Sequence, residues 1–432
     1  MLVSNVQASN AGSYSVTVTN LAGSTTSTGA TLTVNPATGG NLLDFTFQPN
    51  SQTIVNGTTV VFYALAGDTI ESTTSGIRTA DSNGSGATKV PQTAATVSYQ
   101  WFWDGDPIAG ATDSTYVIYD ATAANHGSYT CVATNSSGAV ESDAATLNVV
   151  TDPKPGRLID LSCRAQVGTG VNQLIAGYVV GGQGTSGSEP VLVRASGPAL
   201  APFGVPGVLA DPLLTLNSST GILATNDGWD GNAQVASAAA LVGAFTWTST
   251  SSHDSALLES LPSGDYTAQI TGASGDSGVA LAEVYDATLP GAYTPASPRL
   301  INISARAQVG TAGNILIAGF VIGGTTSKTV LIRGCGPALA AFGLSGTLPD
   351  PQMQLFKSNA DGTSTLVQAD TGWGGDIQIA AAAANVGAFT WGTSPTPDSA
   401  ILITLPPGSY TAQVSGKNGD SGLALVEIYE VP

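Results

Sequence analysis

The sequence RLINISARAQVGTAGNILIAGFV at residues 299–321 is a second copy of RLIDLSCRAQVGTGVNQLIAGYV at residues 157–179. Sixteen of the 23 paired positions are identical. The likeness continues downstream, where VGAFTW occurs twice and LPSGDYTAQITGASGDSGVALAEVYD returns as LPPGSYTAQVSGKNGDSGLALVEIYE. The sequence therefore predicts a tandem duplication with units of about 130 residues, at 157–288 and 299–432.

The composition favours an all-β protein. Of 432 residues, 53 are glycine and only 10% are charged, a mixture that suits short strands joined by tight turns. Each repeat also has one Ala-rich segment that predicts a short helix. The strand candidates of the first repeat are 191–194, 213–216, 256–261, 266–271 and 279–285, and the helix candidates are 233–243 and 377–387. We therefore expect tandem β-sandwiches, with jelly-roll-like repeats that each carry one short helix.

The charge of the chain excludes one class of partner. Its net charge is −18 with only 12 Lys and Arg residues, whereas phosphate binding needs a basic face, so nucleic acid is not an expected partner. No run of 18 apolar residues predicts a membrane span. An acidic surface fits an extracellular or cell-surface protein. MLVSNVQASN lacks the features of a signal peptide, so either an export signal was lost or Met1 is not the natural start.

The N-terminal third contains a second duplication. Residues 1–36 align without a gap onto 116–151, and NAGSYSVTVTNLAGS matches NHGSYTCVATNSSGA. The second copy is preceded by TVVFYALA and VSYQWFWDG. This pattern resembles an immunoglobulin-like domain over roughly residues 44–150. The resemblance implies that Trp101 fills the core of strand C and that Tyr129 is the tyrosine-corner residue.

The resemblance departs from the family at the cysteines. Cys131 occupies the strand-F position, but the strand-B position is Ala64, so the inter-sheet disulfide cannot form. We expect an immunoglobulin-like domain at 37–150 and a partial one, with strands E, F and G only, at 1–36. The partial unit is expected either to belong to a longer chain or to be completed by another chain. The long polar segment 67–95 predicts a mobile loop or a binding loop.

The two repeats resemble C-terminal modules that recur in large secreted proteins of environmental bacteria. Their last part, G-x-Y-x-x-x-(V/I)-x-G-x-x-G-x-x-G, is also similar to the pre-peptidase C-terminal family of β-sandwich domains. Both resemblances imply an accessory module rather than an enzyme.

GDSG occurs in both repeats, at 275–278 and 419–422, and is also found around the nucleophile of trypsin-like proteases. A serine nucleophile needs a histidine base. The chain has only His126 and His253, and His253 aligns with Pro397 in the second repeat. We interpret GDSG as a hairpin turn, and we expect no enzymatic activity.

Two loops have residues that could bind a ligand. Alternating oxygen side chains could bind Ca²⁺, or could form turns that cap the following helix. They are Asn226, Asp227, Asp230 and Asn232 in NDGWDGN, and Asp370 and Asp376 in DTGWGGD. Trp229 and Trp373 in the same loops could stack on sugar rings or could close the end of the sandwich. No other cofactor is expected.

Six of the seven arginines form matched pairs across the repeats. The pairs are Arg157/Arg299, Arg164/Arg306 and Arg194/Arg333. Because an unpaired buried charge is costly, we expect an ion-pair network with acids kept in both copies, such as Glu283 and Glu427. In particular, Arg164 and Arg306 are each expected to pair with a matched acid. The alternative is a pocket for an acidic sugar or a carboxylate.

These observations predict a non-enzymatic extracellular or cell-surface structural or adhesion protein. Its expected partners are other copies of itself, or a cell-surface protein or polysaccharide. The alternative is a carbohydrate-binding accessory region of a larger secreted hydrolase.

Overall fold

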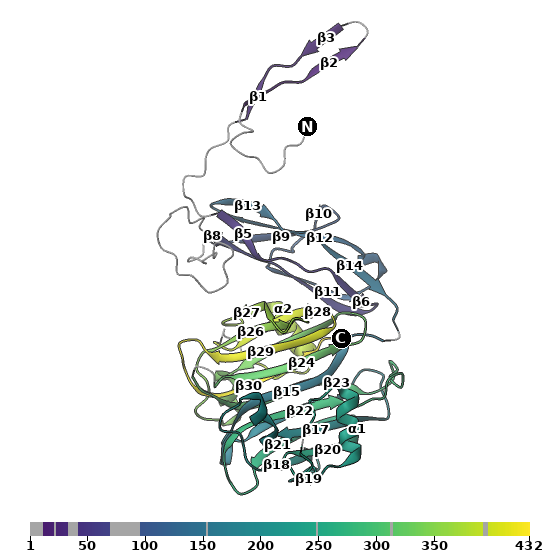
Figure 1. The fold of residues 1–432 in the computed structure, drawn as a ribbon. Coiled ribbons are helices and arrows are strands. Elements are labelled where there is room, and N and C mark those ends of the chain that lie inside the picture. Colours follow the sequence, from purple (N-terminus) through teal and green to yellow (C-terminus); the bar gives the residue numbers. More distant parts are fainter. Residues whose placement is uncertain are drawn as a thin grey trace. The chain divides into compact units, whose positions relative to one another are not determined.

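The computed structural model describes residues 12–20, 23–32, 42–69, 96–152, 154–247, 249–311, 314–391 and 396–432. The fold is all-β, with tandem sandwiches and few helices (Figure 1). The chain divides into two compact units, one with the ranges 1–46, 66–98 and 132–141 and the other with 47–65, 99–131 and 142–432. The expected strand E in residues 1–11 and most of the long segment 67–95 lie outside the described residues.

The described N-terminal strands reproduce part of the downstream immunoglobulin-like domain. Strand β1 (Gly12–Tyr14) pairs with β4 (Ala30–Leu32), and β2 (Thr17–Asn20) pairs with β3 (Gly23–Thr26). Gly12 faces Leu32, just as Gly127 faces Leu147 in the second copy. The register of strands F and G is therefore the same in both copies.

The immunoglobulin-like domain has one larger sheet, with strand order β10-β9-β12-β14-β6 and β13 paired to β12. Strands β11 and β7, and strands β5 and β8, form two further pairs. A short 3₁₀ helix, η2 (Ala123–Asn125), precedes β12. The strands are β5 (Leu42–Phe47), β6 (Gln52–Val55), β7 (Thr58–Tyr63), β8 (Leu65–Thr69), β9 (Ser98–Trp103), β10 (Asp106–Pro107), β11 (Thr115–Ala121), β12 (Gly127–Asn135), β13 (Gly138–Glu141) and β14 (Ala145–Val150).

The core of this domain is built around Trp101. Trp101 is fully buried, and its ring centroid lies 6.1 Å from that of Phe62 on β7. Tyr129 donates from its hydroxyl to the carbonyl oxygen of Asn125 at 2.8 Å, which is the geometry of a tyrosine corner. Both residues thus have the structural positions that the immunoglobulin-like resemblance implies.

Cys131 is a free, buried thiol, as are the other two cysteines. Burial raises the pKa of the Cys131 thiol to about 12, so the reactive thiolate is scarce at neutral pH. We expect alkylation of the folded protein without reductant to leave Cys131 unmodified, and alkylation of the unfolded protein to modify it fully. Intact-mass spectrometry measures both states. A disulfide through Cys131 in the unreduced protein would contradict this expectation.

The repeats contain the expected strands and helices. The first repeat comprises β15 (Arg157–Val167), β16 (Leu174–Gly181), β17 (Ser188–Ser196), β18 (Pro212–Ser218), β19 (Gly221–Asn226), α1 (Ala233–Val242), β20 (Ser255–Pro262), β21 (Gly264–Gly272) and β22 (Gly278–Asp286). The second comprises β23 (Arg299–Val309), β24 (Leu316–Gly323), β25 (Lys328–Cys335), β26 (Pro351–Ser358), β27 (Ser364–Asp370), α2 (Ile377–Asn385), β28 (Ser399–Leu405), β29 (Gly408–Gly416) and β30 (Gly422–Glu430). Short 3₁₀ helices are η3 (Gly170–Asn172), η4 (Pro198–Phe203) and η5 (Pro337–Phe342). No helix of the described chain is both long and apolar enough to cross a membrane.

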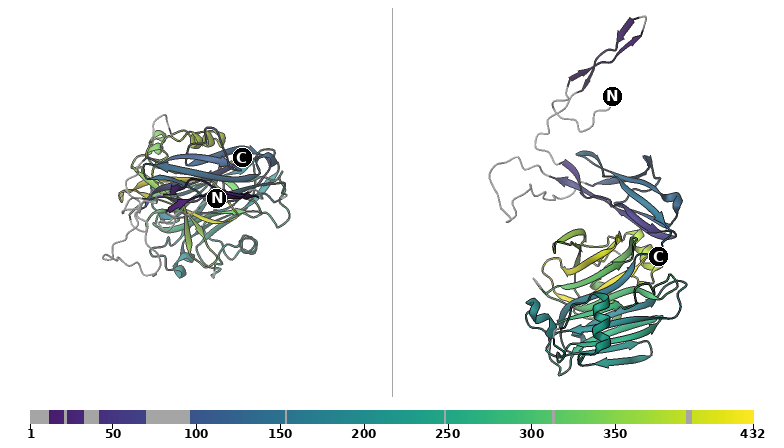
Figure 2. Two further views of the ribbon diagram at one scale, coloured as in Figure 1. Left: turned by 90° about the horizontal axis from the view of Figure 1, so that it is seen from above. Right: turned by 45° about the vertical axis from the view of Figure 1, so that its right-hand side comes forward.

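The two repeats join edge to edge through their first two strands. Strand β15 pairs with β22 of its own repeat and with β24 of the other, and β23 pairs with β30 of its own repeat and with β16 of the other. One run of antiparallel strands is therefore β20-β17-β22-β15-β24-β29-β26-β27, and the other is β28-β25-β30-β23-β16-β21-β18-β19. Figure 2 shows the strands of both repeats, teal to yellow, gathered in one body. Each run contains strands from both repeats.

A glycine lies at the same place of this junction in each repeat. A Cβ atom on Gly177 of β16 would lie 2.6 Å from Ser304 Oγ on β23, and one on Gly319 of β24 would lie 2.5 Å from Ser162 Oγ on β15. A larger residue at either position would require the serine hydroxyl to turn away. The buried apolar side chains of both repeats accordingly form one continuous core.

The GDSG segments are not hairpin turns, which corrects the sequence interpretation. GDSG lies between β21 and β22, but β21 pairs with β16 and β18, whereas β22 pairs with β15 and β17. The segment therefore carries the chain from one run of strands to the other. Gly275 supplies the positive φ of 76° that the turn requires.

Candidate functional site

Each repeat contains one fully buried arginine–glutamate pair. Arg194 Nε lies 3.3 Å from Glu283 Oε2, and Arg333 Nη1 lies 3.3 Å from Glu427 Oε2. Both arginines are 1% exposed. Strand pairing fixes the partners, because Arg194 faces Glu283 across β17 and β22, and Arg333 faces Glu427 across β25 and β30. The duplicated sequence therefore builds the same ion pair twice.

Aromatic rings surround each guanidinium group. Arg194 Cζ lies 4.6 Å from the ring centroid of Phe245 and 4.3 Å from that of Trp247. The matched distances from Arg333 are 4.3 Å to Phe389 and 4.2 Å to Trp391. These contacts add cation–π attraction in a site that excludes water.

Hydroxyl groups complete the first cluster. Glu283 accepts from Ser196 Oγ at 3.0 Å and from Tyr285 Oη at 2.7 Å, and Trp247 Nε1 donates to Ser196 Oγ. Burial raises the pKa of Glu283, while Arg194 and the two hydroxyl groups oppose that rise. Ser196 is replaced by Cys335 in the second repeat, and Trp391 Nε1 there has no hydrogen-bond partner among the described residues. Both clusters are closed to solvent, which fits a structural role.

The two loop tryptophans pack beside these clusters. Trp229 is 8% exposed, and its ring centroid lies 5.4 Å from that of Trp247; the matched pair Trp373 and Trp391 lie 5.6 Å apart. Trp229 Nε1 donates to the Ser249 carbonyl oxygen. Small cavities of about 160 and 100 Å³ lie beside them, next to alanines of α1 and α2. This packing favours a closing role over a platform for sugar rings.

The candidate calcium residues act in turns and helix caps. Asn232 Oδ1 accepts from two backbone N–H groups at the start of α1, and Asp376 Oδ1 does the same for α2. Asn226 Oδ1 accepts from Gly228 and Ala256, and Asp370 Oδ2 accepts from Gly372 and Ala400. Asp227 and Asp230 are exposed, and Asp230 has a positive φ of 51°. Within the described ranges, no group of three or more His, Cys, Asp or Glu side chains could hold a metal ion.

The ion pairs expected for Arg164 and Arg306 are corrected by the structure. No carboxylate of the described chain pairs with either residue, and the arginines that do pair are Arg157, Arg194, Arg299 and Arg333. Arg164 alternates with buried neighbours along β15 and is only half-buried. For Arg164, a long arginine stem can lie along the sheet while its charged head reaches water, so an ion pair is not required. Arg306 Nε is buried and has no hydrogen-bond partner among the described residues.

A second charged cluster lies where β15 and β23 begin. Arg157 Nη2 pairs with Asp286 at 3.0 Å, and the matched Arg299 Nε pairs with Glu430 at 2.9 Å. Lys328 Nζ lies 3.6 Å from the same Glu430 oxygen. Burial alone would raise the pKa of Glu430, but Lys328 and Arg299 hold it below its ordinary value. Tyr293, from the segment between the repeats, stacks on Arg157 at 3.9 Å.

Glu189 occupies the position that Lys328 has in the second repeat. Glu189 is buried, and neither of its oxygens has a hydrogen-bond partner among the described residues. Burial and the charge of Asp286 raise the pKa of Glu189 to about 9, although Arg157 opposes the shift. Its carboxyl group is therefore protonated at neutral pH.

This protonation predicts a pH dependence of stability. In the unfolded chain Glu189 ionises near its ordinary pKa of about 4.3, so between that value and about 9 the folded state binds more protons. The free energy of unfolding should therefore fall as pH rises through this window. Glu189→Gln mimics the protonated form and should raise the free energy of unfolding near neutral pH by on the order of 3 kcal/mol.

Urea denaturation at several pH values tests the Glu189 prediction. The Glu189→Gln chain should lose most of the pH slope, and a control change at an exposed residue, Glu141→Gln, should keep it. Equal slopes in the original chain and in Glu189→Gln would show that Glu189 is ionised in the folded protein.

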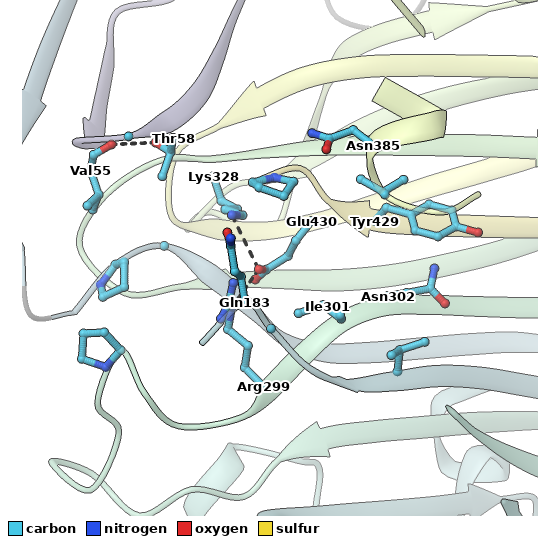
Figure 3. A pocket seen from close by; sticks show the side chains of 18 of the residues that line it. Val55, Thr58, Gln183, Arg299, Ile301, Asn302, Lys328, Asn385, Tyr429 and Glu430 are labelled. Carbon is cyan, nitrogen blue, oxygen red and sulfur yellow. Dashed lines mark hydrogen bonds and ion pairs between the residues drawn. The ribbon is translucent and has the colours of Figure 1, made fainter. Parts of the chain in front are cut away.

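A cavity lies beside the Arg299–Glu430 pair of this second cluster, and Figure 3 shows it from close by. Its volume is about 750 Å³. Arg299, Lys328, Glu430 and Gln183 lie together in the view, and Asn302, Asn385 and Tyr429 lie along another side. We call this cavity the polar cleft; it is lined by Val55–Thr58, Pro155, Gly156, Val179, Gly182, Gln183, Asp265, Tyr293, Pro295, Arg299, Ile301, Asn302, Thr326–Lys328, Asn385–Gly387, Tyr429, Glu430 and Pro432.

The polar cleft is not evident from the sequence. Its 24 lining residues come from segments that are far apart in the chain, and nine of them are ordinary amide or hydroxyl residues. The sequence contains one indication of it. The arginine of the cluster is kept in both repeats, as Arg157 and Arg299, whereas the buried position beside it is Glu189 in the first repeat and Lys328 in the second. A charge reversal between otherwise similar buried positions indicates that the two sites differ in function or stability.

Comparisons with known proteins concern the fold only. No protein-family model matches the chain, and no curated protein matches it. It is similar to the tandem immunoglobulin repeats of Dlar, with 22% identity over 34% of this chain and 66% of that chain and a TM-score of 0.22. The Ig1–2 module of the Drosophila receptor protein tyrosine phosphatase DLAR is 21% identical over 30% of this chain and 58% of that chain, with a TM-score of 0.20. The chain thus spans 66% or less of these two solved chains, and at these TM-scores the likeness does not bear on ligand or partner.

Proposed function

We propose that this chain is a non-enzymatic structural and adhesion protein that works outside the cell or at its surface. The observation that supports it best is the pairing of β15 with β24 and of β16 with β23, which joins both repeats into one body with a shared core. Such a body cannot come apart at a linker between its repeats, which suits a rigid spacer under load. The acidic composition also fits an extracellular protein.

The titratable side chains support the absence of catalysis. The matched pairs Arg194–Glu283 and Arg333–Glu427 are buried under aromatic rings, where no substrate reaches them. His253 lies 3.3 Å from Asp211 on the surface, but the second repeat has Pro397 at that position. His126 is held by the backbone of Val149. A catalytic site would need an accessible acid or base beside a nucleophile.

Surface location tests this proposal. On intact cells that make the protein, we expect antibodies to label it and an added protease to remove it. Protection from the protease until the cells are lysed would overturn the extracellular assignment. Hydrolysis of polysaccharide or peptide substrates by the purified chain would overturn the non-enzymatic one.

Self-assembly through the N-terminal strands is the finer part of the proposal. Val16 and Val18 are each 62% exposed, whereas the matched Cys131 and Ala133 are fully buried in the immunoglobulin-like domain. Covering two such side chains stabilises an association by roughly 1.5–3 kcal/mol each. A strand or sheet edge from another chain would cover these side chains.

Light scattering tests this assembly. The full chain should show a mass above that of a monomer that rises with concentration, and a chain of residues 37–432 should remain monomeric. The double change Val16→Asp and Val18→Asp should have the same effect as the deletion, because the two aspartates place charge on the uncovered face. Thr17→Asp with Thr19→Asp is the matched control on the neighbouring positions. Monomers of the full chain at every concentration would exclude assembly through this segment.

A second candidate function is a carbohydrate-binding accessory region of a larger secreted hydrolase. One observation favours it, which is the size and polar lining of the cleft in Figure 3.

A further inference from the structure

Two cations meet at one carboxylate beside the polar cleft. Arg299 and Lys328 both lie against Glu430 Oε2, and all three residues line the cleft. Asp265 is the other charged residue of the lining. The whole chain has only 12 Lys and Arg residues and a net charge of −18, so two cations at one carboxylate are a local exception.

Arg299 has donors left over for a ligand. Its Nε donates to Glu430, but its two terminal nitrogens make no hydrogen bond to any described residue, and its side chain is 20% exposed. The backbone passes close to these nitrogens, since a Cβ atom on Gly182 would lie 2.5 Å from Arg299 Nη1. Glycine at 182 thus leaves the guanidinium group open to the cleft.

The rim of the cleft offers neutral hydrogen-bonding groups. Asn56, Gln183 and Asn385 are exposed, and their side-chain amides make no hydrogen bond within the described chain. Amides of this kind donate to and accept from hydroxyl groups. The rings of Tyr293 and Tyr429 also line the cleft. A cavity of about 750 Å³ falls within the range of small-molecule sites, about 300–1,000 Å³.

We propose that the polar cleft binds a carboxylate-bearing saccharide, with the carboxylate on Arg299 and the hydroxyl groups on the rim amides. A guanidinium group with two free terminal nitrogens matches the geometry of a carboxylate. This inference deepens the proposed adhesive function by naming the surface chemistry to which the protein attaches. It rests on the proposed function only in assuming that the protein meets its ligand outside the cell.

An oligogalacturonide and its methyl ester are suitable probes, because they share a sugar backbone and differ in charge. Titration calorimetry of the full chain, with a chelator present to prevent calcium bridging, should show binding of the acid form that weakens with added salt. The methyl ester should bind at least tenfold more weakly. Equal binding of both forms, or binding of neither, overturns the proposal.

Charge changes at the rim locate the site without disturbing the ion pairs. Gln183→Glu and Asn385→Asp should each weaken binding by about two- to fivefold through repulsion, and Gln183→Lys should strengthen it by a similar factor. The control is Gln166→Glu, an exposed change at the opposite end of β15, which should have no effect. If Gln166→Glu weakens binding as much as Gln183→Glu does, attraction is not centred on the cleft and the proposal fails.

Arg299→Met removes the proposed carboxylate partner and should weaken binding by about 10- to 100-fold. Because this change also leaves Glu430 with one partner fewer, circular dichroism must first show that the variant is folded. If it is unfolded, the sign reversal between Gln183→Glu and Gln183→Lys decides the question. Failure of these titrations leaves the surface-labelling result intact, so the ligand and the location are tested separately.

Discussion

Replacing Glu283 with alanine is expected to lower the free energy of unfolding of the joined repeats by about 3–5 kcal/mol. Arg194 would keep its charge in a site where it is only 1% exposed, without the carboxylate that lies 3.3 Å from it. Ser196 and Tyr285 would also lose their acceptor. Urea denaturation followed by tryptophan fluorescence measures the loss, since Trp247 lies in the same cluster.

A double change separates the charge from the packing. Arg194→Met with Glu283→Met removes both charges and keeps apolar volume, so it should be far less destabilising than Glu283→Ala alone. Glu427→Ala is the matched change in the second repeat and should have a similar cost, because Arg333 has the same burial and the same aromatic neighbours. If the double change is as harmful as the single one, packing rather than an unpaired charge controls stability here.

Local patterns in the sequence predicted the elements of this fold well. The Ala-rich segments form α1 and α2, and each strand candidate lies within a strand of the structure. Matched arginines and acids also indicated buried ion pairs. The specific assignment to Arg164 and Arg306 was wrong because strand periodicity alone does not say how much of a sheet's outer face is covered.

The path of the strands between repeats could not be predicted, for a physical reason. Residues 157–179 and 299–321 are so alike that β16 has nearly the same fit to β15 as to β23. Sequence complementarity therefore cannot distinguish pairing within a repeat from pairing between repeats. The polar cleft depends on this choice, because the pairing of β16 with β23 places Gly181 opposite Arg299, next to Gly182 and Gln183 of the lining. Tyr293, from the segment between the repeats, also stacks on Arg157.

The same likeness leads to the second prediction, that an isolated first repeat, residues 157–288, will not fold as a monomer. In the full chain β16 pairs with β23, and β15 pairs with β24. In the isolated repeat, β15 and β16 therefore each lose one neighbouring strand. It also loses half of a continuous core that holds side chains from both repeats. Strand edges and apolar surface exposed in this way favour association.

A second copy of the isolated repeat can supply what is missing. With sixteen of 23 positions shared, β15 of one copy can take the place of β23 beside β16 of the other, and the exchange can be mutual. We therefore expect light scattering to give twice the monomer mass and denaturation to depend on protein concentration. Gly177→Val should weaken the dimer, because its side chain would meet Ser162 of the other copy as it would meet Ser304 in the full chain. A stable, folded monomer of residues 157–288 would mean that β15 and β16 can pair within one repeat, and that the junction between repeats is not needed to complete either sandwich.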